Sequence, residues 1–156
     1  MKKFLQKKLK DQKGMTLIEL LAVIVIIAII AAIAIPAIGN IIENSRYGAA
    51  KSDASNVLSA ANIYFTENPE DDSATLTELK AGYLQSAGIF DDATTETDVY
   101  VTKANPNTLT APSLEYSGDK TIAFTGATLD AINGDTTKGS DVATVTITTT
   151  VTTTAE

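Results

Sequence analysis

The stretch from Met15 to Ile42 decides the fold; it reads MTLIELLAVIVIIAIIAAIAIPAIGNII, with Glu19 as its single charged residue before Ile42. Leu20 to Gly39 contain no charged or strongly polar side chain. Twenty helical residues span roughly 30 Å, which is the thickness of a bilayer's hydrocarbon core. The β-branched run Val23–Ile27 also suits a buried strand. Length favours a helix, because a lipid-exposed segment must satisfy its own backbone hydrogen bonds.

Charge is divided between the two sides of this segment. Residues 1–14 contain six lysines and one acid, whereas the remaining 142 residues contain 6 bases and 18 acids, a balance of −12. Lysines flanking a membrane helix stay on the cytoplasmic side, so we expect residues 1–14 inside the cell and the chain beyond residue 40 outside. The acidic exported part lacks the basic surface of nucleic-acid-binding proteins, so no direct nucleic-acid binding is predicted.

The composition of the 156-residue chain argues against an enzyme. It contains no His and no Cys, which excludes cysteine nucleophiles, histidine bases, disulfides and zinc sites of the usual kind. A catalyst here would depend on carboxylates, lysines and hydroxyls alone, and no glycine-rich phosphate loop or pair of catalytic carboxylates is evident. We therefore expect no enzyme activity, no catalytic residue and no cofactor.

Glu19 separates three interpretations of the N-terminal region. The first two are a secretory signal cleaved at Ala32-Ile33-Ala34 and a plain membrane anchor. A carboxylate in a membrane helix costs roughly 2.5–3.5 kcal/mol near the centre and less toward an end. No cation lies within one turn in the sequence, so we expect its partner to be water, a headgroup or another molecule. In the third interpretation, cleavage after Gly14 exposes an α-amino group on Met15, which pairs with Glu19 of a neighbouring copy.

The residues around this glycine resemble the class III leader and N-terminal helix of type IV pilins and pseudopilins. The resemblance lies in Gly14, the following TLIELL at residues 16–21, the long Ile/Ala/Val run and Pro36. It implies that a membrane prepilin peptidase cleaves after Gly14 and N-methylates Met15. It also implies that Glu19 neutralises a neighbouring subunit's N-terminus during assembly. Met15 departs from the family, which most often has Phe there.

The resemblance extends to about residue 65 and implies a structural function. The precursor would lie in the cytoplasmic membrane, surrounded by lipids, with its head outside. The assembly machinery of a pilus or secretion system would then polymerise it into an extracellular homopolymer, a helical filament for adhesion, motility or DNA uptake. Pro36 and Gly39 are the positions at which the helix is expected to weaken, with the stretch before Pro36 unwinding in the filament.

Two alternatives remain open at this point. Within the family, the chain is also compatible with a pseudopilin of a competence or type II secretion system. From a different class, a conventionally secreted or membrane-anchored binding protein would carry a similar apolar segment. The absence of Cys departs from the disulfide of many Gram-negative pilins and favours a Gram-positive or otherwise disulfide-free lineage.

The predicted fold class is α+β, in which one long helix packs on a small antiparallel sheet. We divide the chain into a cleaved leader (1–14), a transmembrane or filament-core half-helix (15–40), an amphipathic half-helix (41–66) and a globular head (67–156). The amphipathic half is predicted from apolar residues spaced 3 or 4 apart. They are Ala50, Ala54, Val57, Ala61 and Tyr64, widened by Leu58 and Phe65. Asn68-Pro69 is expected to end the helix, because the residue before proline avoids the α region.

The head is predicted to begin with a short helix over residues 75–80. A capping box between Thr75 and Glu78 is expected at its start. After the helix, Tyr83 and Leu84 are expected to pack back onto the core. Strands are expected at 99–102, 113–116, 120–125 and 143–151, with a hairpin turn at 117–120. The last strand alternates between Val145 or Ile147 and threonines, which predicts one apolar and one hydroxyl face.

Acidic clusters in the head raise the question of a calcium site. The residues concerned are Asp91-Asp92 and the group Asp130, Asn133, Asp135 and Asp141. Calcium needs six to eight oxygen ligands, and the EF-hand pattern is absent, so no metal is predicted. Asn133-Gly134 is interpreted instead as a tight turn with positive φ. The threonine-rich tail at 148–154 is compatible with glycosylation or with a frayed terminal strand.

Overall fold

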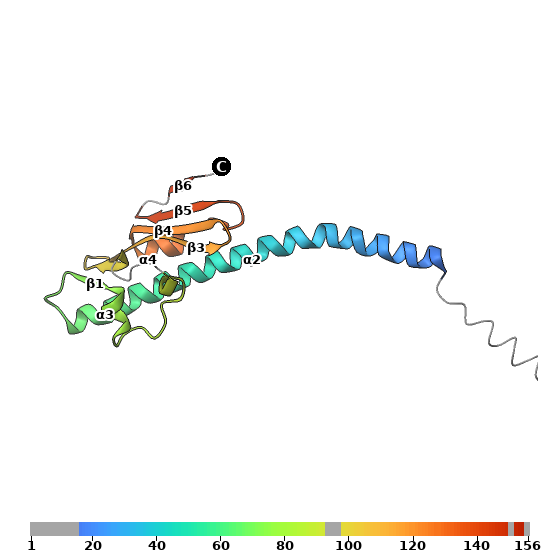
Figure 1. The fold of residues 1–156 in the computed structure, drawn as a ribbon. Coiled ribbons are helices and arrows are strands. Elements are labelled where there is room, and N and C mark those ends of the chain that lie inside the picture. Colours follow the sequence, from blue (N-terminus) through green and yellow to red (C-terminus); the bar gives the residue numbers. More distant parts are fainter. Residues whose placement is uncertain (1–15, 93–97, 150–151, 155–156) are drawn as a thin grey trace, which may run out of the picture. The chain divides into compact units, whose positions relative to one another are not determined.

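The computed structural model describes residues 16–92, 98–149 and 152–154. It divides into two compact units, Met1–Gly39 and Asn40–Glu156, which we describe separately. Helix α2 (Leu17–Glu67) contributes its first part to the N-terminal unit and its second part to the head (Figure 1). Asn68 follows the helix and bonds back to the Tyr64 carbonyl through its backbone N–H (2.8 Å) and its side-chain amide (3.0 Å). The helix end predicted at Asn68-Pro69 is confirmed.

The amphipathic stripe predicted for the second part of α2 is also confirmed. Its buried members are Ala50, Ala54, Val57, Leu58, Ala61 and Phe65, joined by Tyr47 and Ala60. Tyr64 is only partly buried, because its hydroxyl reaches out to Asp71 (2.7 Å). Four of these side chains are alanines, which allow the strands and loops of the head to approach the helix closely.

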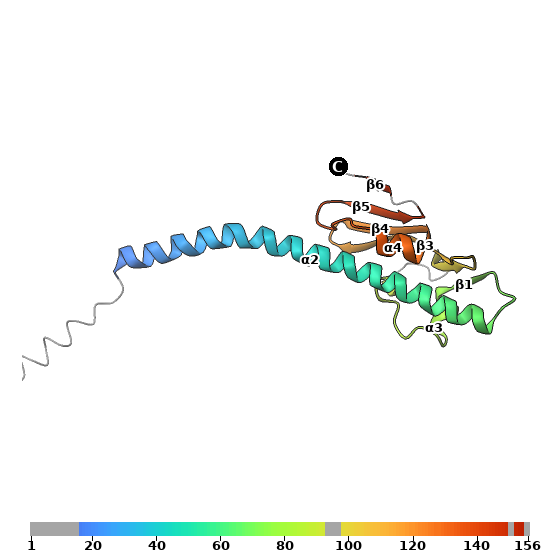
Figure 2. The same cartoon turned by 180° about the vertical axis from the view of Figure 1, so that it is seen from behind.

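The head contains a six-stranded sheet whose spatial order follows the sequence (Figures 1 and 2). The strands are β1 (Ser73–Thr75), β2 (Tyr100–Thr102), β3 (Thr108–Ser117), β4 (Lys120–Ala127), β5 (Thr144–Thr148) and β6 (Thr152–Thr154). The helices are α3 (Leu76–Lys80), the 3₁₀ helix η1 (Gly88–Asp92) and α4 (Leu129–Gly134). The α+β class is therefore confirmed, with six strands in the described residues where four were expected.

The predicted antiparallel sheet is wrong at one pair, since β4 and β5 run parallel, with Thr121 opposite Thr144 and Thr125 opposite Thr148. A parallel pair needs a crossover connection. Here α4 and the loop after it carry the chain back to the start of β4. The sequence reading missed α4 because it assigned Asn133-Gly134 to a turn. Gly134 ends α4, and the glycines with positive φ in the described residues are Gly88, Gly118 and Gly126.

Three other local predictions are confirmed. Thr75 caps α3 and forms the expected capping box with Glu78, whose carboxylate accepts from the Thr75 backbone N–H at 2.7 Å. The backbone N–H groups of Tyr83 and Leu84 both donate to the Leu79 carbonyl, so these residues fold back onto the core as predicted. The hairpin turn between β3 and β4 has Gly118 at φ 56°.

The head has one hydrophobic core between α2 and the inner face of the sheet. Ile122, Phe124, Val145 and Ile147 are fully buried there. Phe90 of η1 lies against Phe124 with ring centroids 5.7 Å apart. The outward-facing residues of β5 are threonines, so the apolar and hydroxyl faces predicted for this strand are confirmed for residues 144–148. Val151 lies outside the described residues.

Candidate functional site

Glu19 lies in the first turn of α2 and caps it. Its Oε2 accepts a hydrogen bond from the Thr16 backbone N–H (2.7 Å) and another from the Thr16 hydroxyl (2.8 Å). In return the Glu19 N–H donates to Thr16 Oγ1 at 3.3 Å. This reciprocal arrangement is a capping box, and a carboxylate at a helix N-terminus is further favoured by the helix dipole.

This contact corrects one expectation about Glu19. The carboxylate finds hydrogen-bond donors in its own chain, so its partner need not come from water, a headgroup or another molecule. Thr16 is the residue that the sequence reading missed. Its signal was available, because Thr16 and Glu19 have the same T-x-x-E spacing that was used to identify the Thr75–Glu78 box. Both bonds from Thr16 end on Oε2, and in the described part of the chain Oε1 accepts none.

Gly14 and Met15, the predicted cleavage and methylation positions, lie outside the described residues. Pro36 and Gly39 are described, and α2 continues through both. In the isolated chain a Cβ added at Gly39 would meet no atom within 4 Å, so close packing within this chain does not explain the glycine. Unwinding of the stretch before Pro36 in a filament stays a prediction.

The first part of α2 presents a continuous apolar surface. Every large apolar side chain from Leu17 to Ile38 is exposed in the isolated chain, and Ile33 and Ile35 are each 70% exposed. By length and composition, α2 is apolar enough to cross a membrane. Exposed apolar patches of this size mark contacts with lipid or with other proteins. The apolar surface of this part of α2 can therefore contact the lipid of a bilayer or pack against similar helices.

The head holds a second notable cluster, around Asp135. Its carboxylate accepts from the Tyr47 hydroxyl (2.5 Å) and from both the hydroxyl (2.5 Å) and the N–H (3.2 Å) of Thr137, with the Lys51 ammonium 3.3 Å away. Burial pushes the pKa of Asp135 upward, but the bonds from Thr137 and Tyr47 and the charge of Lys51 outweigh it and lower the pKa. Burial and the bond to Asp135 raise the pKa of Tyr47. This cluster fastens the loop after α4 to helix α2.

These contacts bear on the calcium question. The oxygens of Asp135 are occupied by donors from the protein, and Asp91 is held by the Lys80 ammonium at 2.8 Å, which lowers the pKa of Asp91. Over the described ranges, no group of three or more Asp and Glu side chains is placed to hold a metal ion.

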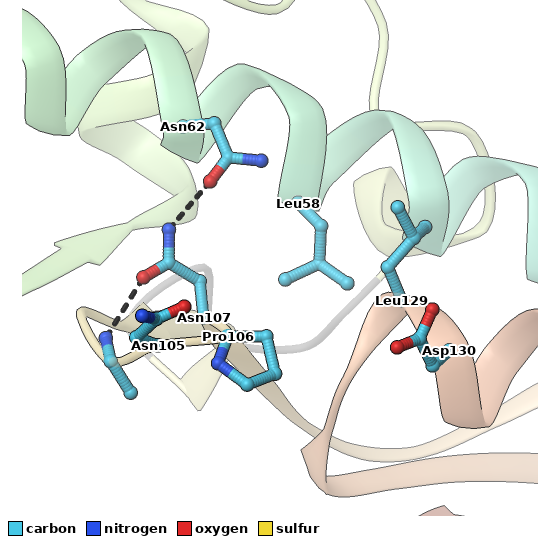
Figure 3. A pocket seen from close by; sticks show the side chains of 8 residues that line it. Leu58, Asn62, Asn105, Pro106, Asn107, Leu129 and Asp130 are labelled. Atoms are coloured by element: carbon cyan, nitrogen blue, oxygen red, sulfur yellow. Dashed lines mark hydrogen bonds between the residues drawn. The ribbon is translucent and has the colours of Figure 1, made fainter.

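A shallow cavity of about 320 Å³ lies between α2, the loop before β3 and α4 (Figure 3). Asn107 crosses its edge: its amide donates to Asn62 Oδ1 (2.6 Å) and its own oxygen accepts from the Ala104 N–H (2.8 Å). Leu58 forms the apolar floor, and Asp130 is the one ionisable side chain in the lining. The lining has a single carboxylate with no nucleophile or second base beside it, so it lacks the combination of side chains that a catalytic site needs.

The comparison with family models decides what the N-terminal segment is. Residues 9–35 match the prokaryotic N-terminal methylation motif. This motif is the class III leader of type IV pilins and pseudopilins, so the resemblance found in the sequence is confirmed for this segment. The matched residues contain Gly14, Met15, the Thr16–Glu19 capping box and most of the exposed apolar surface. Searches of curated proteins and of solved structures gave no match.

The methylation motif and the apolar helix together fit a membrane-anchored precursor that is processed by a prepilin peptidase. Families with this motif are structural and generally not enzymatic. The motif is common to pilins and pseudopilins, so it leaves the choice between a pilus and a secretion or competence system to further argument.

Proposed function

We propose that this chain is a structural subunit of a type IV pilus. The prepilin is exported with residues 1–14 in the cytoplasm, cleaved after Gly14 and N-methylated at Met15, and held in the membrane by residues 15–40. It then polymerises through this helix into an extracellular fibre that serves adhesion, motility or DNA uptake. The observation that carries the proposal is a methylation motif at residues 9–35 that leads directly into an unburied apolar helix.

The energetics of assembly follow from one helix with two successive environments. In the membrane the apolar surface contacts lipid, and in the fibre it contacts the same surface of other copies. Contacts that repeat head to tail without closing into a ring generate an open helical filament. Glu19 sets the register between copies by pairing its carboxylate with the methylated amine of Met15 in the neighbouring subunit.

Our alternative within the family is a pseudopilin of a competence or type II secretion system, which forms a short fibre. The size of the head favours the pilin, because the segment Asn68–Glu156 is longer than we expect for the head of the smallest competence pseudopilins. The test is electron microscopy of wild-type cells labelled with an antibody against the head. Abundant long fibres support the pilin, and fibres that appear only on overexpression support the pseudopilin.

A matched pair of variants ties fibre formation to processing. Gly14→Leu removes the glycine before the cleavage position, whereas Gly48→Leu makes the same change at an open position of α2 in the head, where an added Cβ meets nothing within 4 Å. We expect the first variant to accumulate in the membrane as the uncleaved precursor without fibres, and the second to be cleaved normally. Fibres assembled from uncleaved Gly14→Leu would refute the proposal.

A further inference from the structure

The outer face of the sheet is almost free of charge. Its outward positions on β2 to β5 are mainly threonines, which we call the threonine face: Thr102, Thr108, Thr110, Thr121, Thr125, Thr144, Thr146 and Thr148. In these four strands the charged residues are Glu115 and Lys120. Lys120 belongs to the other side, because its ammonium lies 3.5 Å from Glu43 of α2. Glu115 is thus the one charge on the outward positions of these strands.

Strand register arranges these threonines in rows. Thr121 lies opposite Thr144 and Thr125 opposite Thr148, and the Thr121 hydroxyl donates to Thr144 Oγ1 at 3.3 Å. Neighbouring strands are about 4.8 Å apart, and alternate residues of one strand are about 6.8 Å apart. Each hydroxyl can donate one hydrogen bond and accept two, so a threonine surface satisfies the hydrogen-bonding needs of an identical surface. Such self-complementarity is what a two-fold contact between copies requires.

The exported chain as a whole is strongly acidic. It contains 18 acids, of which Glu115 is the one on the threonine face, and 6 bases. Several of the bases are already used within the subunit, as in the pairs Lys51–Asp135, Lys80–Asp91 and Lys120–Glu43. Two copies that approach through their acidic surfaces repel each other. Within the described part of the sheet, the threonine face is a broad surface over which two heads can meet with one carboxylate on each, that of Glu115.

We propose that the threonine face binds the same face of a second copy in a neighbouring fibre and so holds fibres side by side in bundles. This inference rests on the proposed function, since it requires fibres. The four strands have 3, 10, 8 and 5 residues and together cover roughly 400 Å² on each copy. A contact of that size is below the area of a stable dimer, so single subunits stay apart. A fibre repeats the contact along its length, and this multivalency makes the association stable.

The test adds charge to the face of the full-length protein in assembled fibres. The face variant combines Thr125→Glu with Thr144→Glu, both at exposed positions. Its control combines Asn133→Glu with Thr136→Glu, which adds the same charge at exposed positions at the end of α4 and in the following loop. Bundles are measured as the fraction of fibres in a low-speed pellet and by electron microscopy. We expect the face variant to form single fibres, with a pelleted fraction on the order of tenfold lower than that of wild type, because the weakened contact repeats at every head. We expect the control variant to bundle like wild type.

Salt distinguishes this contact from one made by opposite charges. Wild-type bundling should increase with NaCl, because salt screens the remaining repulsion between acidic heads, whereas an ion-pair contact would weaken. The inference is overturned if the face variant bundles like wild type. It is also overturned if that variant is processed but forms no fibre, since the face would then lie inside the fibre. A third contradicting result is that removal of cell-surface polysaccharide abolishes wild-type bundling, since the polysaccharide would then hold the fibres together. A wild-type chain that is never cleaved or polymerised contradicts the proposed function itself.

Discussion

At the residue scale, Glu19 has one role that the structure shows and a second that we propose. In the isolated chain it completes a capping box with Thr16, and in the proposed fibre its carboxylate pairs with the amine of a neighbouring Met15. The two roles are compatible, because the hydrogen bonds from Thr16 use Oε2 and leave Oε1 for another donor. They differ in what they require, since a cap needs an oxygen acceptor whereas pairing with an amine needs a negative charge.

This difference gives a prediction with two substitutions. Glu19→Ala removes cap and charge, and Glu19→Gln keeps an acceptor for the capping box but removes the charge. We expect both variants to insert into the membrane and to be processed, and both to fail to enter fibres. Membrane fractionation and electron microscopy provide the measurements. Normal fibres from Glu19→Gln would show that capping alone explains this residue.

Asp135 gives a second prediction at the same scale. Because its pKa in the folded head is lowered, folding stability from this group is fully present above the ordinary Asp pKa, near 4, and is lost as pH falls through the folded value. Asp135→Asn should cost about 2 kcal/mol at neutral pH, since it removes a charged acceptor from buried hydrogen bonds. The variant should also lose less stability than wild type between pH 5 and pH 2, a range around that ordinary value.

The measurement is thermal unfolding of the full-length chain in detergent, followed by circular dichroism. Asp130→Asn is the control, since Asp130 is exposed and, among the residues that the structure describes, its carboxylate makes no contact of this kind. Equal stability of the Asp135→Asn variant and wild type at neutral pH would contradict the role assigned to this cluster. At the alkaline end, the raised pKa of Tyr47 implies that stability is present below the ordinary tyrosine pKa and declines as pH rises above it.

Helix α2 is the element on which the account depends. It continues through Pro36 in the isolated chain, although proline removes one backbone hydrogen bond and normally strains the preceding turn. We expect this turn to be the weakest part of the helix, so that residues 28–36 are less helical in the fibre than in the membrane. Backbone density from electron cryomicroscopy of assembled fibres measures this directly. An unbroken helix over these residues in the fibre would be evidence against unwinding.

Elements with a local signal were predicted well, and those that depend on distant residues were not. Thr75 and Glu78 specify α3 within one turn, and the alternation of Val145 and Ile147 with threonines specifies the two faces of β5. The parallel pairing of β4 with β5 depends instead on the path of the chain through α4. No residue within β5 distinguishes a parallel from an antiparallel neighbour, because the side-chain period is the same in both.

The strands β1 and β6 were missed for a related reason. Each has three residues, too few to show a period, and each is defined by its pairing with another strand, β2 for β1 and β5 for β6. At the N-terminus the opposite holds. Length, charge and the residues around Gly14 identify the segment from sequence alone, because a membrane helix depends on composition and not on tertiary contacts.

At the scale of the whole molecule, the proposed cleavage after Gly14 makes the net charge of −7 a property of the precursor and not of the fibre subunit. Removal of residues 1–14 takes away six lysines and one acid and leaves an exported chain with a side-chain balance of −12. The subunit then combines an apolar helix that provides cohesion, a strongly acidic head and one sheet face on which Glu115 is the one charge among the strand residues of β2 to β5. Each part has a separate role in the proposed fibre: the helix in polymerisation, the acidic surface in keeping heads apart, and the threonine face in lateral contact.

The most direct test of the central claim is the intact mass of the mature protein isolated from the cell surface. The account predicts a chain that begins at Met15 and carries one additional methyl group on its N-terminal amine, with tandem mass spectrometry placing the methyl on that residue. A chain that begins near Ile35, as after cleavage of a conventional signal peptide, would contradict it.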